Sequence, residues 1–398
     1  MRAPLILLGV GLTAWPITAS AAPQSLPPIP HPPPIAPSFQ RGPVTTADVE
    51  NISLLLPTAQ ATCGGETVHA AYSDDLAVQT VQSAGAVETP DTLIRFSIAE
   101  DGRTRDIKVA PSAHGFSSSY SVDPLAALAA WRFAGGARSD CLLTVSYRPV
   151  PIAEAASGDL LRYFAVTRTR GAVRDAVGNR LAGAEANCGG DRRGGRRPRT
   201  VSYPDNLVGQ RPPPGGKAWT VVRWDVNAQG RATNVRTLGS SGDRAFDGES
   251  RRAVSATVVE GGAPLKGCVY NFYRTGPVLP APAMPDRADE PLVSCPADVR
   301  ARLQIRPNPD TYPKGFNDRQ IEGWALVRFD VATWGQLGNV TLLDAQPASA
   351  FGDGGMTTVR SSRAESGTTP GVGCIVPVRY HIGARGNGET TQVEASTD

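Results

Sequence analysis

The chain has 398 residues, and its 42 Gly and 35 Pro exceed the usual share of these two types, which predicts many turns and linkers. Its 40 basic and 37 acidic residues leave a net charge of +3, which disfavours a protein that coats nucleic acid. Only four His are present, so a His-rich metal enzyme is not expected. The length suggests about two to four domains.

The N-terminus has the features of a secretory signal peptide. Residues 5–14 are uncharged and mostly apolar, Pro16 interrupts the run, and the small residues Ala19–Ala22 follow. This run is shorter than the roughly 20 residues of a membrane-spanning helix. We expect residues 1–22 to be cleaved and the mature chain to be periplasmic, with a retained anchor as the alternative.

Residues 23–50 form a Pro-rich segment, with nine Pro among residues 23–43. Such a segment cannot pack a core and favours an extended conformation. A plain linker is the preferred interpretation, and a stiff arm that holds the folded part away from a surface is the alternative.

The six Cys indicate a unit that is used three times. They lie at 63, 141, 188, 268, 295 and 374, so gaps of 78, 80 and 79 residues alternate with shorter ones. Within each long gap a similar four-residue pattern begins with an Arg, and a Gly follows seven residues after that Arg. These pairs are Arg95 and Gly102, Arg223 and Gly230, and Arg328 and Gly335. Because several anchors keep one register, we interpret the pattern as three tandem repeats.

The most economical pairing joins the two Cys of each repeat: Cys63 with Cys141, Cys188 with Cys268, and Cys295 with Cys374. Each disulfide closes a loop of about 80 residues, which stabilises the fold by roughly 4 kcal/mol in the chain-entropy estimate. Metal binding is the competing interpretation, but the sequence has no C-x-x-C pair.

Within each repeat the pattern predicts a hairpin, a helix and a third strand. Residues 93–98 and 107–109 alternate around a turn that ends at Gly102, residues 125–133 supply an apolar helical face, and an apolar β-rich run follows Cys141. The expected fold class is therefore α+β, with a small antiparallel sheet and one packed helix in each repeat. The expected segments are a signal peptide (1–22), a Pro-rich linker (23–50), repeats at 51–150, 185–278 and 291–383, a basic linker (151–184), a linker (279–290) and a flexible tail (384–398).

The second repeat resembles the C-terminal domain of TonB proteins. The resemblance rests on Tyr203-Pro204, Val221–Val226, Gly230, Asn234-Val235, Ser240–Gly242 and Phe246-Asp247. The third repeat is similar at Tyr312-Pro313, Gly323, Val327–Val331, Asn339-Val340 and Phe351, and the first is the most divergent. Together the matches cover about 300 residues of the chain. The chain differs from the family in its three copies, its paired Cys and its removable N-terminal segment, which puts motor coupling in doubt.

The resemblance implies a non-catalytic periplasmic domain that binds an extended segment of an outer-membrane transporter, or of another envelope protein, by strand pairing. In the family, this domain passes on force from a proton-driven motor of the inner membrane. The expected partner-binding edge is in the second repeat: Val269, Tyr270, Asn271, Phe272 and Tyr273.

The counterparts of this edge are Leu142–Tyr147 in the first repeat and Ile375–Tyr380 in the third. Pro377 removes one donor from the third edge and disfavours pairing there. Coverage of all three edges by neighbouring repeats is the alternative. In that case the chain is an envelope structural protein with no peptide-binding edge.

Other signals point to no catalytic residues, cofactor, metal or nucleic-acid partner. The sequence has no G-x-S-x-G motif, and Gly239–Gly242 lacks the Lys of a P-loop. Nine Arg between 168 and 199 are interpreted as a solvated linker, with contact to an anionic surface as the alternative. Residues 160–166 are expected to form a packing helix, and Asp74-Asp75 to be turn carboxylates. Membrane contact is expected only if the N-terminal segment is retained.

Overall fold

The computed structural model describes residues 51–82, 89–110, 122–167, 171–188, 203–204, 211–259, 264–285, 295–306, 308–385 and 388–395. All of them belong to the second of the chain's two units, Pro43–Asp398. The expected signal peptide and the Pro-rich linker lie outside the described residues. Among the residues that are described, no helix is long and apolar enough to cross a membrane.

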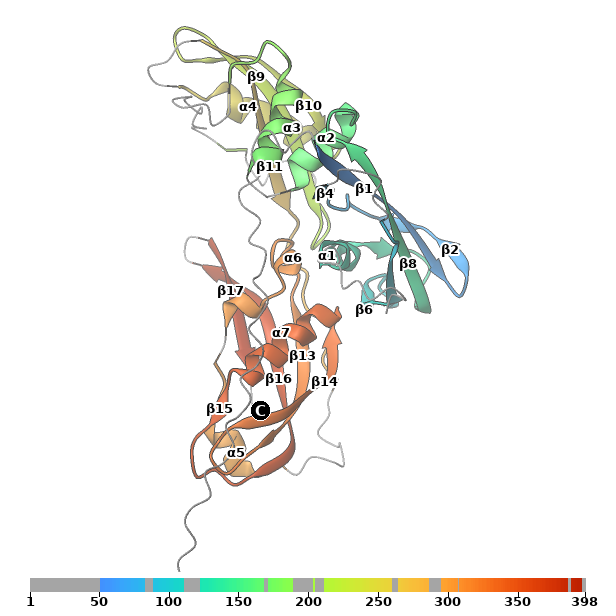
Figure 1. Ribbon diagram of the computed structural model, residues 1–398, viewed down its shortest axis with the longest axis vertical. Helices are drawn as coiled ribbons and strands as arrows, with labels where there is room; N and C mark the ends of the chain where they lie inside the picture. Colours follow the sequence, from blue (N-terminus) through green and yellow to red (C-terminus); the bar gives the residue numbers. More distant parts are fainter. Residues whose placement is uncertain are drawn as a thin grey trace, which may run out of the picture. The chain divides into compact units, whose positions relative to one another are not determined.

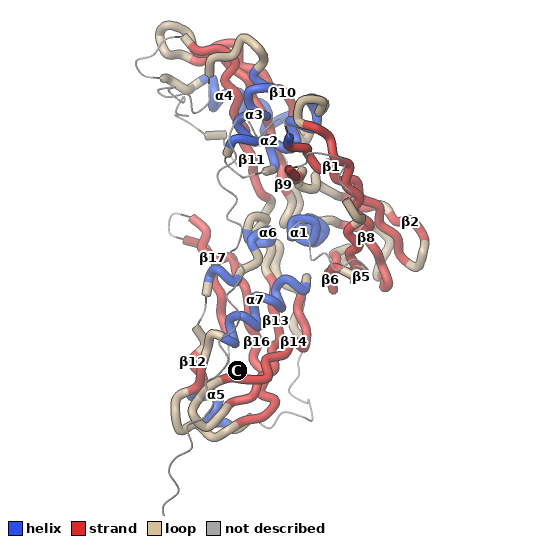
Figure 2. Tube along the Cα trace, in the orientation of Figure 1, coloured by secondary structure: helices blue, strands red, loops and turns tan. Residues whose placement is uncertain are grey.

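The strands outnumber the helices and carry most of the fold (Figures 1 and 2). The strands are β1 (Ile52–Cys63), β2 (Glu66–Val68), β3 (Ala70–Tyr72), β4 (Gln79–Gln82), β5 (Thr92–Ile98), β6 (Thr104–Val109), β7 (Arg132–Phe133), β8 (Arg138–Pro151), β9 (Lys217–Val226), β10 (Ala232–Ser240), β11 (Leu265–Thr275), β12 (Leu303–Gln304), β13 (Gly323–Val331), β14 (Leu337–Gln346), β15 (Arg363–Ala364), β16 (Gly371–Arg385) and β17 (Gly388–Ala395). The helices are α1 (Val122–Ala130), α2 (Ser157–Val166), α3 (Ala172–Ala182), α4 (Arg244–Ser255), α5 (Ala297–Arg302), α6 (Lys314–Asn317) and α7 (Ser349–Arg360), with a 3-10 turn, η2, at Pro309–Thr311.

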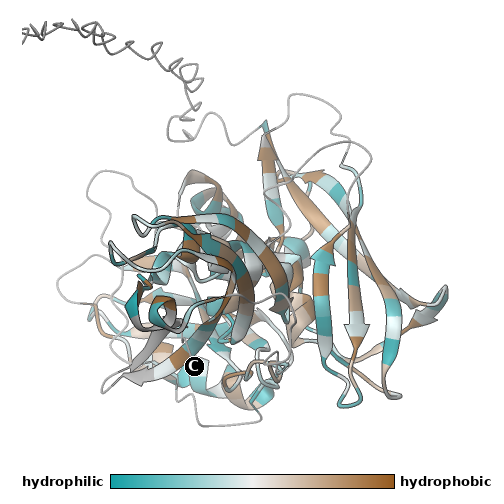
Figure 3. Cartoon of the chain, turned by 90° about the horizontal axis from the view of Figure 1, so that it is seen from below, coloured by the Kyte–Doolittle hydropathy of each residue, from teal (hydrophilic) through white to brown (hydrophobic). Residues whose placement is uncertain are grey.

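Three antiparallel sheets dominate the described residues, in agreement with the expected α+β class. The first has the order β2-β1-β8-β5-β6 with β4 beside β1, the second β10-β9-β11, and the third β14-β13-β16-β17. In each sheet a hairpin is followed by a helix and then by a strand that pairs with the first hairpin strand on its other side. Strand β5 shows the alternation that sets these sheets, because its buried and exposed residues follow each other along the strand. Figure 3 shows polar and apolar residues following one another along the strands.

The same tight turn closes the hairpin of all three sheets. At Gly230 the backbone has φ +75°, its amide donates to Asn227 O (2.9 Å), and its carbonyl accepts from Val259 N (2.7 Å). A Cβ atom at Gly230 would overlap the carbonyl oxygen of Val259, so a side chain does not fit there. Gly102 and Gly335 have the same positive φ and the same pair of hydrogen bonds.

A second feature recurs one strand later. Asp106, Asn234 and Asn339 all have positive φ, at 54°, 53° and 48°. In the second sheet Asn234 donates to the Asp225 carboxylate (2.8 Å), which also accepts from the amide of Gly267 (2.8 Å). In the third sheet the corresponding bonds are Asn339 to Asp330 and Gly373 to Asp330, both 2.7 Å, whereas in the first sheet Ser97 donates to Asp106.

The disulfides of the structure are those that the Cys spacing favours. Cys63 pairs with Cys141, Cys188 with Cys268, and Cys295 with Cys374, and their Cα atoms are 4.0, 4.9 and 4.8 Å apart. Cys63 and Cys141 also face each other as register partners in β1 and β8. No Cys is left unpaired.

The hydrophobic core does not divide at the expected repeat boundaries. One cluster joins residues of the first sheet and α1, such as Ile107 and Leu128, to residues of α6 and α7, such as Phe316 and Phe351. A second joins Leu54 of β1 to α2 and to Trp219 of β9. A third belongs to the second sheet and α4 alone.

Two segments differ from expectation. The expected basic linker, 151–184, contains α2 and α3, whose apolar residues are buried against β1 and the second sheet. Helix α2 confirms the packing helix expected at residues 160–166. The expected flexible tail, 384–398, contains β17, whose residues pair with β16 from Arg385 back to Val378. In residues 151–184 packing with distant residues decides the structure. In the tail, pairing with the adjacent strand β16 decides it.

Asp74 and Asp75 are not turn carboxylates but join parts of the chain that are far apart in sequence. Asp74 forms a buried ion pair with Arg319, two residues after the end of α6, and its carboxylate accepts a hydrogen bond from the backbone amide of Lys217 (3.2 Å). Asp75 accepts Trp219 Nε1 (3.0 Å) and pairs with Arg162 of α2 (3.1 Å). At this junction, burial and then the Asp74 carboxylate raise the pKa of Tyr72 to about 12.

Candidate functional site

Strand β11 contains the five residues expected to form the partner-binding edge. It is the terminal strand of the second sheet and pairs with β9 through Val269–Arg223, Asn271–Val221 and Tyr273–Trp219. Among the described residues no strand pairs with the side of β11 that faces away from β9. We call this side the β11 edge. Because a terminal strand directs alternate N–H and C=O groups outward, this edge can pair with an extended segment.

The β11 residues alternate between two packed faces of the sheet. Phe272 is buried in the cluster beneath α4, and Tyr270 packs beside it with ring centroids 4.8 Å apart and the rings tilted by 56°. Arg274 is also buried on this face, where it pairs with Asp243 and lies over the Phe246 ring. Asp243 caps α4 by accepting the Phe246 amide (3.0 Å), so the pair fixes the helix on the sheet.

The opposite face of β11 packs against α2 and α3. Asn271 donates to the carbonyl of Ala165 (3.2 Å) and accepts from Arg174 (2.6 Å). Arg174 also donates to the carbonyls of Phe164 (2.6 Å) and Thr167 (2.7 Å). Arg174 was part of the Arg-rich segment interpreted as a solvated linker, and here it ties α2 and α3 to β11. The Arg at 168, 170, 192, 193, 196, 197 and 199 lie outside the described residues.

Three tyrosines at β11 are exposed. Tyr203, Tyr270 and Tyr273 are 71%, 36% and 42% exposed, and the Tyr203 ring lies edge-on to Phe272 at 6.3 Å. Tyrosine combines a large contact area with a hydrogen-bonding hydroxyl and is enriched in protein interfaces. The sequence prediction included Tyr270 and Tyr273 in the edge, and Tyr203 only as part of the family resemblance.

The counterpart edges are covered by strands from the same chain. In the first sheet β1 pairs with β8 along all of Leu142–Tyr147, so this expected counterpart is wrong as an open edge. In the third sheet β17 pairs with Val378, Arg379 and Tyr380, whereas Ile375–Pro377 have no second strand partner among the described residues. The covering strands β1 and β17 belong to the same sheets as the edges that they cover. The alternative interpretation required coverage by neighbouring repeats instead.

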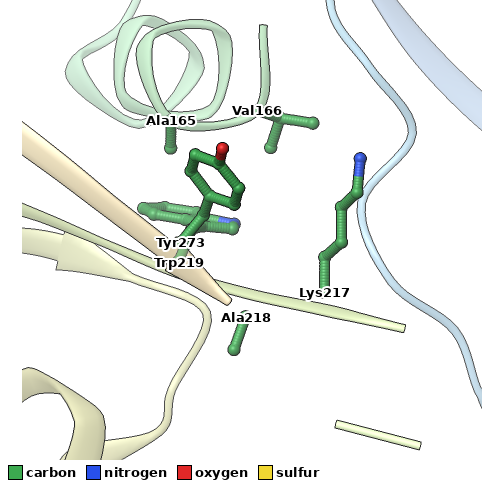
Figure 4. Close-up of a pocket in the computed structure, with 6 residues that line it drawn as sticks. All are labelled: Ala165, Val166, Lys217, Ala218, Trp219 and Tyr273. Atoms are coloured by element: carbon green, nitrogen blue, oxygen red, sulfur yellow. The ribbon is translucent and has the colours of Figure 1, made fainter. Parts of the chain in front are cut away.

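A shallow recess lies beside the β11 edge on the α2 face (Figure 4). Its volume is about 280 Å³ including the space open to solvent, and it is lined by Ala165, Val166, Lys217, Ala218, Trp219 and Tyr273. The Trp219 ring is held by a hydrogen bond from its Nε1 to the Asp75 carboxylate, and the backbone amide of Trp219 donates to Ser241 Oγ (2.9 Å). Sequence reasoning missed the recess because it treated residues 160–166 as a packing helix within a linker and did not consider β9 as part of a site.

The described residues contain no cluster of His, Cys, Asp or Glu that could hold a metal ion.

Two carboxylates beside the hairpins have a lowered pKa, and their hydrogen bonds stabilise the turns. Hydrogen bonds from Asn339 and the Gly373 amide lower the pKa of Asp330. Partial burial alone would raise the pKa of Asp225. Hydrogen bonds from the Gly267 amide and from Asn234 have the larger combined effect, so the pKa of Asp225 is lowered.

No protein-family model matches the chain. It is similar to Protein TonB of Salmonella typhimurium strain LT2, with 34% identity over 123 residues, which are 31% of this chain and 47% of that protein. Protein TonB of Klebsiella pneumoniae is 32% identical over 119 residues, 30% of this chain and 47% of the relative. Protein TonB of Escherichia coli K12 is 34% identical over 104 residues, 26% and 40% of the two chains. The chain spans about half the length of these relatives or less, and the similarity supports a domain like the C-terminal domain of TonB.

Proposed function

We propose that this chain is a non-catalytic, TonB-like protein of the periplasm that binds an extended segment of an outer-membrane transporter, or of another envelope protein, along the β11 edge. The observation that carries the proposal is the contrast between the three sheets. Strands β8 and β16 pair on their outer sides with β1 and β17, whereas β11 has no such partner among the described residues. The exposed tyrosines beside β11 supply contact area for a partner.

We also propose that the three sheets are divergent copies of one unit, at residues 51–150, 185–278 and 291–383. The recurring glycine turn, the recurring positive-φ position and the three disulfides, which span 78, 80 and 79 residues, support this proposal. The disulfides fit an oxidising compartment. The shared hydrophobic clusters then reflect packing between copies rather than one undivided ancestral core.

Strand pairing can be tested with peptides whose backbone is blocked on one side. Ten-residue peptides tiled through the periplasmic segments of outer-membrane transporters are titrated against the full chain by fluorescence anisotropy. Any binder is then N-methylated either at its odd or at its even residues. A strand uses one set of N–H groups for one edge, so one methylated form is expected to lose binding and the other to keep it. Equal loss for both forms, or no binding by any tile, contradicts strand pairing.

A fragment of residues 185–278 is unsuitable for this test. It lacks α2 and α3, which cover Trp219 and Val221 of the second sheet. Exposing these two side chains would create a new apolar surface that binds peptides non-specifically. The full chain therefore has to be used.

An envelope structural protein remains the second candidate, because the sheets contact one another. Gln346 of β14 exchanges hydrogen bonds with Asp106 of β6, and the Asp74–Arg319 pair joins the first sheet's segment to α6. Native cross-linking that finds only a stable assembly, together with no peptide binding, favours this candidate.

Mass spectrometry of the mature N-terminus separates two forms of the main proposal. A chain that starts near Pro23 acts as an adaptor that binds without a membrane anchor. A chain that keeps residues 1–22 has an apolar segment that can couple it to the inner membrane and to TonB-dependent transport.

A further inference from the structure

We propose that the β11 edge selects a segment with two large apolar side chains separated by one residue, and that these side chains pack on Tyr270, Phe272 and Tyr203. The three rings lie on the face of the second sheet that carries α4, which we call the α4 face. This proposal rests on the strand pairing at the β11 edge proposed above. It adds the chemistry of the partner: an extended chain that is apolar at alternate positions.

A hydrogen bond at the end of β11 shows which of its backbone groups point away from β9. The amide of Gly276, the residue after β11, donates to the carbonyl of Gly216, the residue before β9 (2.8 Å). The register between the two strands is unbroken from residue 268 to residue 275. Bonded and non-bonded positions alternate in an antiparallel pair, so the even residues of β11 bond to β9. The odd residues, such as Val269 and Asn271, direct their N–H and C=O groups towards the β11 edge.

The chain itself closes the beginning of this edge. The amides of Asn187 and Cys188 donate to the carbonyl of Lys266 (3.1 and 3.2 Å), and the Lys266 amide donates to Asn187 Oδ1 (2.6 Å). The disulfide of Cys188 holds this short segment against β11. An added strand therefore begins its pairing at Val269, and Tyr270 is the first β11 side chain that it meets on the α4 face.

Aromatic rings cover the α4 face beside the edge. Helix α4 packs mainly over β9 and β10, and it leaves the Tyr270 side chain at the edge 36% exposed. The buried Phe272 ring contacts both Tyr270 and Tyr203, with centroids 4.8 and 6.3 Å apart, and Tyr203 is 71% exposed. This face therefore offers a continuous aromatic surface to the side chains of an added strand.

The pleat of the sheet sets the spacing of the partner's side chains. Every second residue of an added strand lies on the α4 face, so two residues separated by one lie beside Tyr270 and Phe272. In an antiparallel arrangement these are the non-hydrogen-bonded positions of the new pair, where facing side chains come closest. Aromatic and branched apolar side chains stabilise a sheet when they face aromatic rings at such positions. Polar side chains would leave the aromatic surface in contact with water.

The test compares peptides that have the same composition. Ten-residue peptides of Thr and Ser carry two Phe separated by one residue, which places both on one face of a strand, or by two residues, which places them on opposite faces. Matched peptides carry Leu or Ala in place of Phe, and affinities for the full chain are measured by fluorescence anisotropy. We expect the closer spacing to increase the affinity of the Phe and Leu peptides by about fivefold to tenfold, and to make no difference for the Ala peptides.

Three variants show whether the aromatic surface causes this preference. Tyr270→Thr and Tyr203→Ser are each expected to reduce the effect of spacing by about twofold to threefold, and the double variant to abolish it. Trp334→Ser removes a ring of similar exposure (68%) from the turn between β13 and β14, and it is expected to leave the effect unchanged. Circular dichroism and non-reducing electrophoresis confirm that each variant is folded with its disulfides.

Hydrogen exchange resolved by residue in NMR spectra locates the bound peptide. Binding at the β11 edge is expected to slow the exchange of the Val269 and Asn271 amides, which point outward. The Tyr270 and Phe272 amides bond to β9, so their exchange is expected to be slow with and without peptide.

The outcomes distinguish this proposal from the proposed function. If peptides protect the Val269 and Asn271 amides but the spacing has no effect, strand pairing stands and the aromatic subsite is wrong. If the effect of spacing persists in the double variant, it arises elsewhere and the aromatic subsite is also wrong. If no peptide protects these amides, the β11 edge is not a binding site, and the proposed function fails with it. A dimer that protects them without peptide shows that a second copy of the chain occupies the edge, which overturns both proposals.

Discussion

Arg319 and Asp74 form an ion pair whose side chains are 0% and 6% exposed. Removing one member of a buried pair leaves the other charge uncompensated, which costs about 3–5 kcal/mol. We expect Arg319→Met to lower the free energy of unfolding by about this amount in urea titrations of the full chain, and Asp74→Asn/Arg319→Met to recover part of the loss. The control Lys314→Met breaks the exposed pair with Asp318 and is expected to cost less than about 1 kcal/mol. If Arg319→Met and Lys314→Met lower the free energy of unfolding equally, the buried pair does not have the stabilising role described here.

Gly230, in the hairpin turn of the second sheet, and Gly248, in the helix α4 that packs on this sheet, provide a matched pair of glycines. Gly230 has φ +75° and no room for a Cβ, whereas Gly248 lies inside α4 with open space around it. We expect Gly230→Ala to destabilise the chain by more than about 1 kcal/mol and Gly248→Ala to stabilise it by about 0.5–1 kcal/mol. Thermal unfolding that ranks the two variants in the opposite order is inconsistent with the turn geometry described above.

The lowered pKa values of Asp225 and Asp330 predict a loss of stability in acid. Each carboxylate contributes stability that is fully present above its unfolded pKa of about 3.9, and this stability is lost as the pH falls through the lowered folded value. We expect Asp225→Asn/Asp330→Asn to be less stable than wild type at pH 7 but to lose less stability between pH 5 and pH 3. Denaturant midpoints measured across this range check the prediction, and parallel curves contradict it.

At the scale of elements, β17 covers part of the edge of the third sheet that corresponds to the β11 edge. It pairs with β16 from Val378 to Arg385. If β17 keeps a peptide away from this edge, a chain that ends at Arg385 is expected to bind two peptides, where the full chain binds one. Isothermal titration calorimetry gives the count, and a chain that ends at Ala395 serves as the control. A count of one in both chains contradicts a covering role for β17.

The sequence predicts the hairpins, the closing strands and the disulfides, because alternation, turn glycines and Cys spacing are local signals. It does not predict that β1 and β17 join the sheets, because strand pairing depends on which edge is open, and periodicity does not report that. Helix α3 is missed for a related reason: residues 172–182 include Gly178 and Asn179, and their polar composition reads as a linker. Its packing depends on Arg174 and Val177, which contact distant residues.

At the scale of the whole molecule, the sequence suggests three independent units, and the packing does not. The cluster that contains Ile107 and Leu128 also contains Phe316 and Phe351, and the cluster that contains Leu54 also contains Trp219. The apolar pattern of a strand tells which face is buried but not which other element buries it. The contacts between sheets are therefore the part of the fold that the sequence leaves open.

Shared clusters predict that the sheets unfold together. We expect differential scanning calorimetry of the oxidised chain to show one transition in which the calorimetric and van't Hoff enthalpies agree. Phe246 of α4 is buried in the cluster that belongs to the second sheet and α4, and Phe246→Ala is expected to cost about 3–5 kcal/mol. In a cooperative molecule this variant lowers the single transition as a whole. One cluster joins the second sheet to the first, and the other cluster and the Asp74–Arg319 pair join the first sheet to the segment of the third. Three resolved transitions, of which Phe246→Ala lowers only one, would instead show independent units joined by weak contacts.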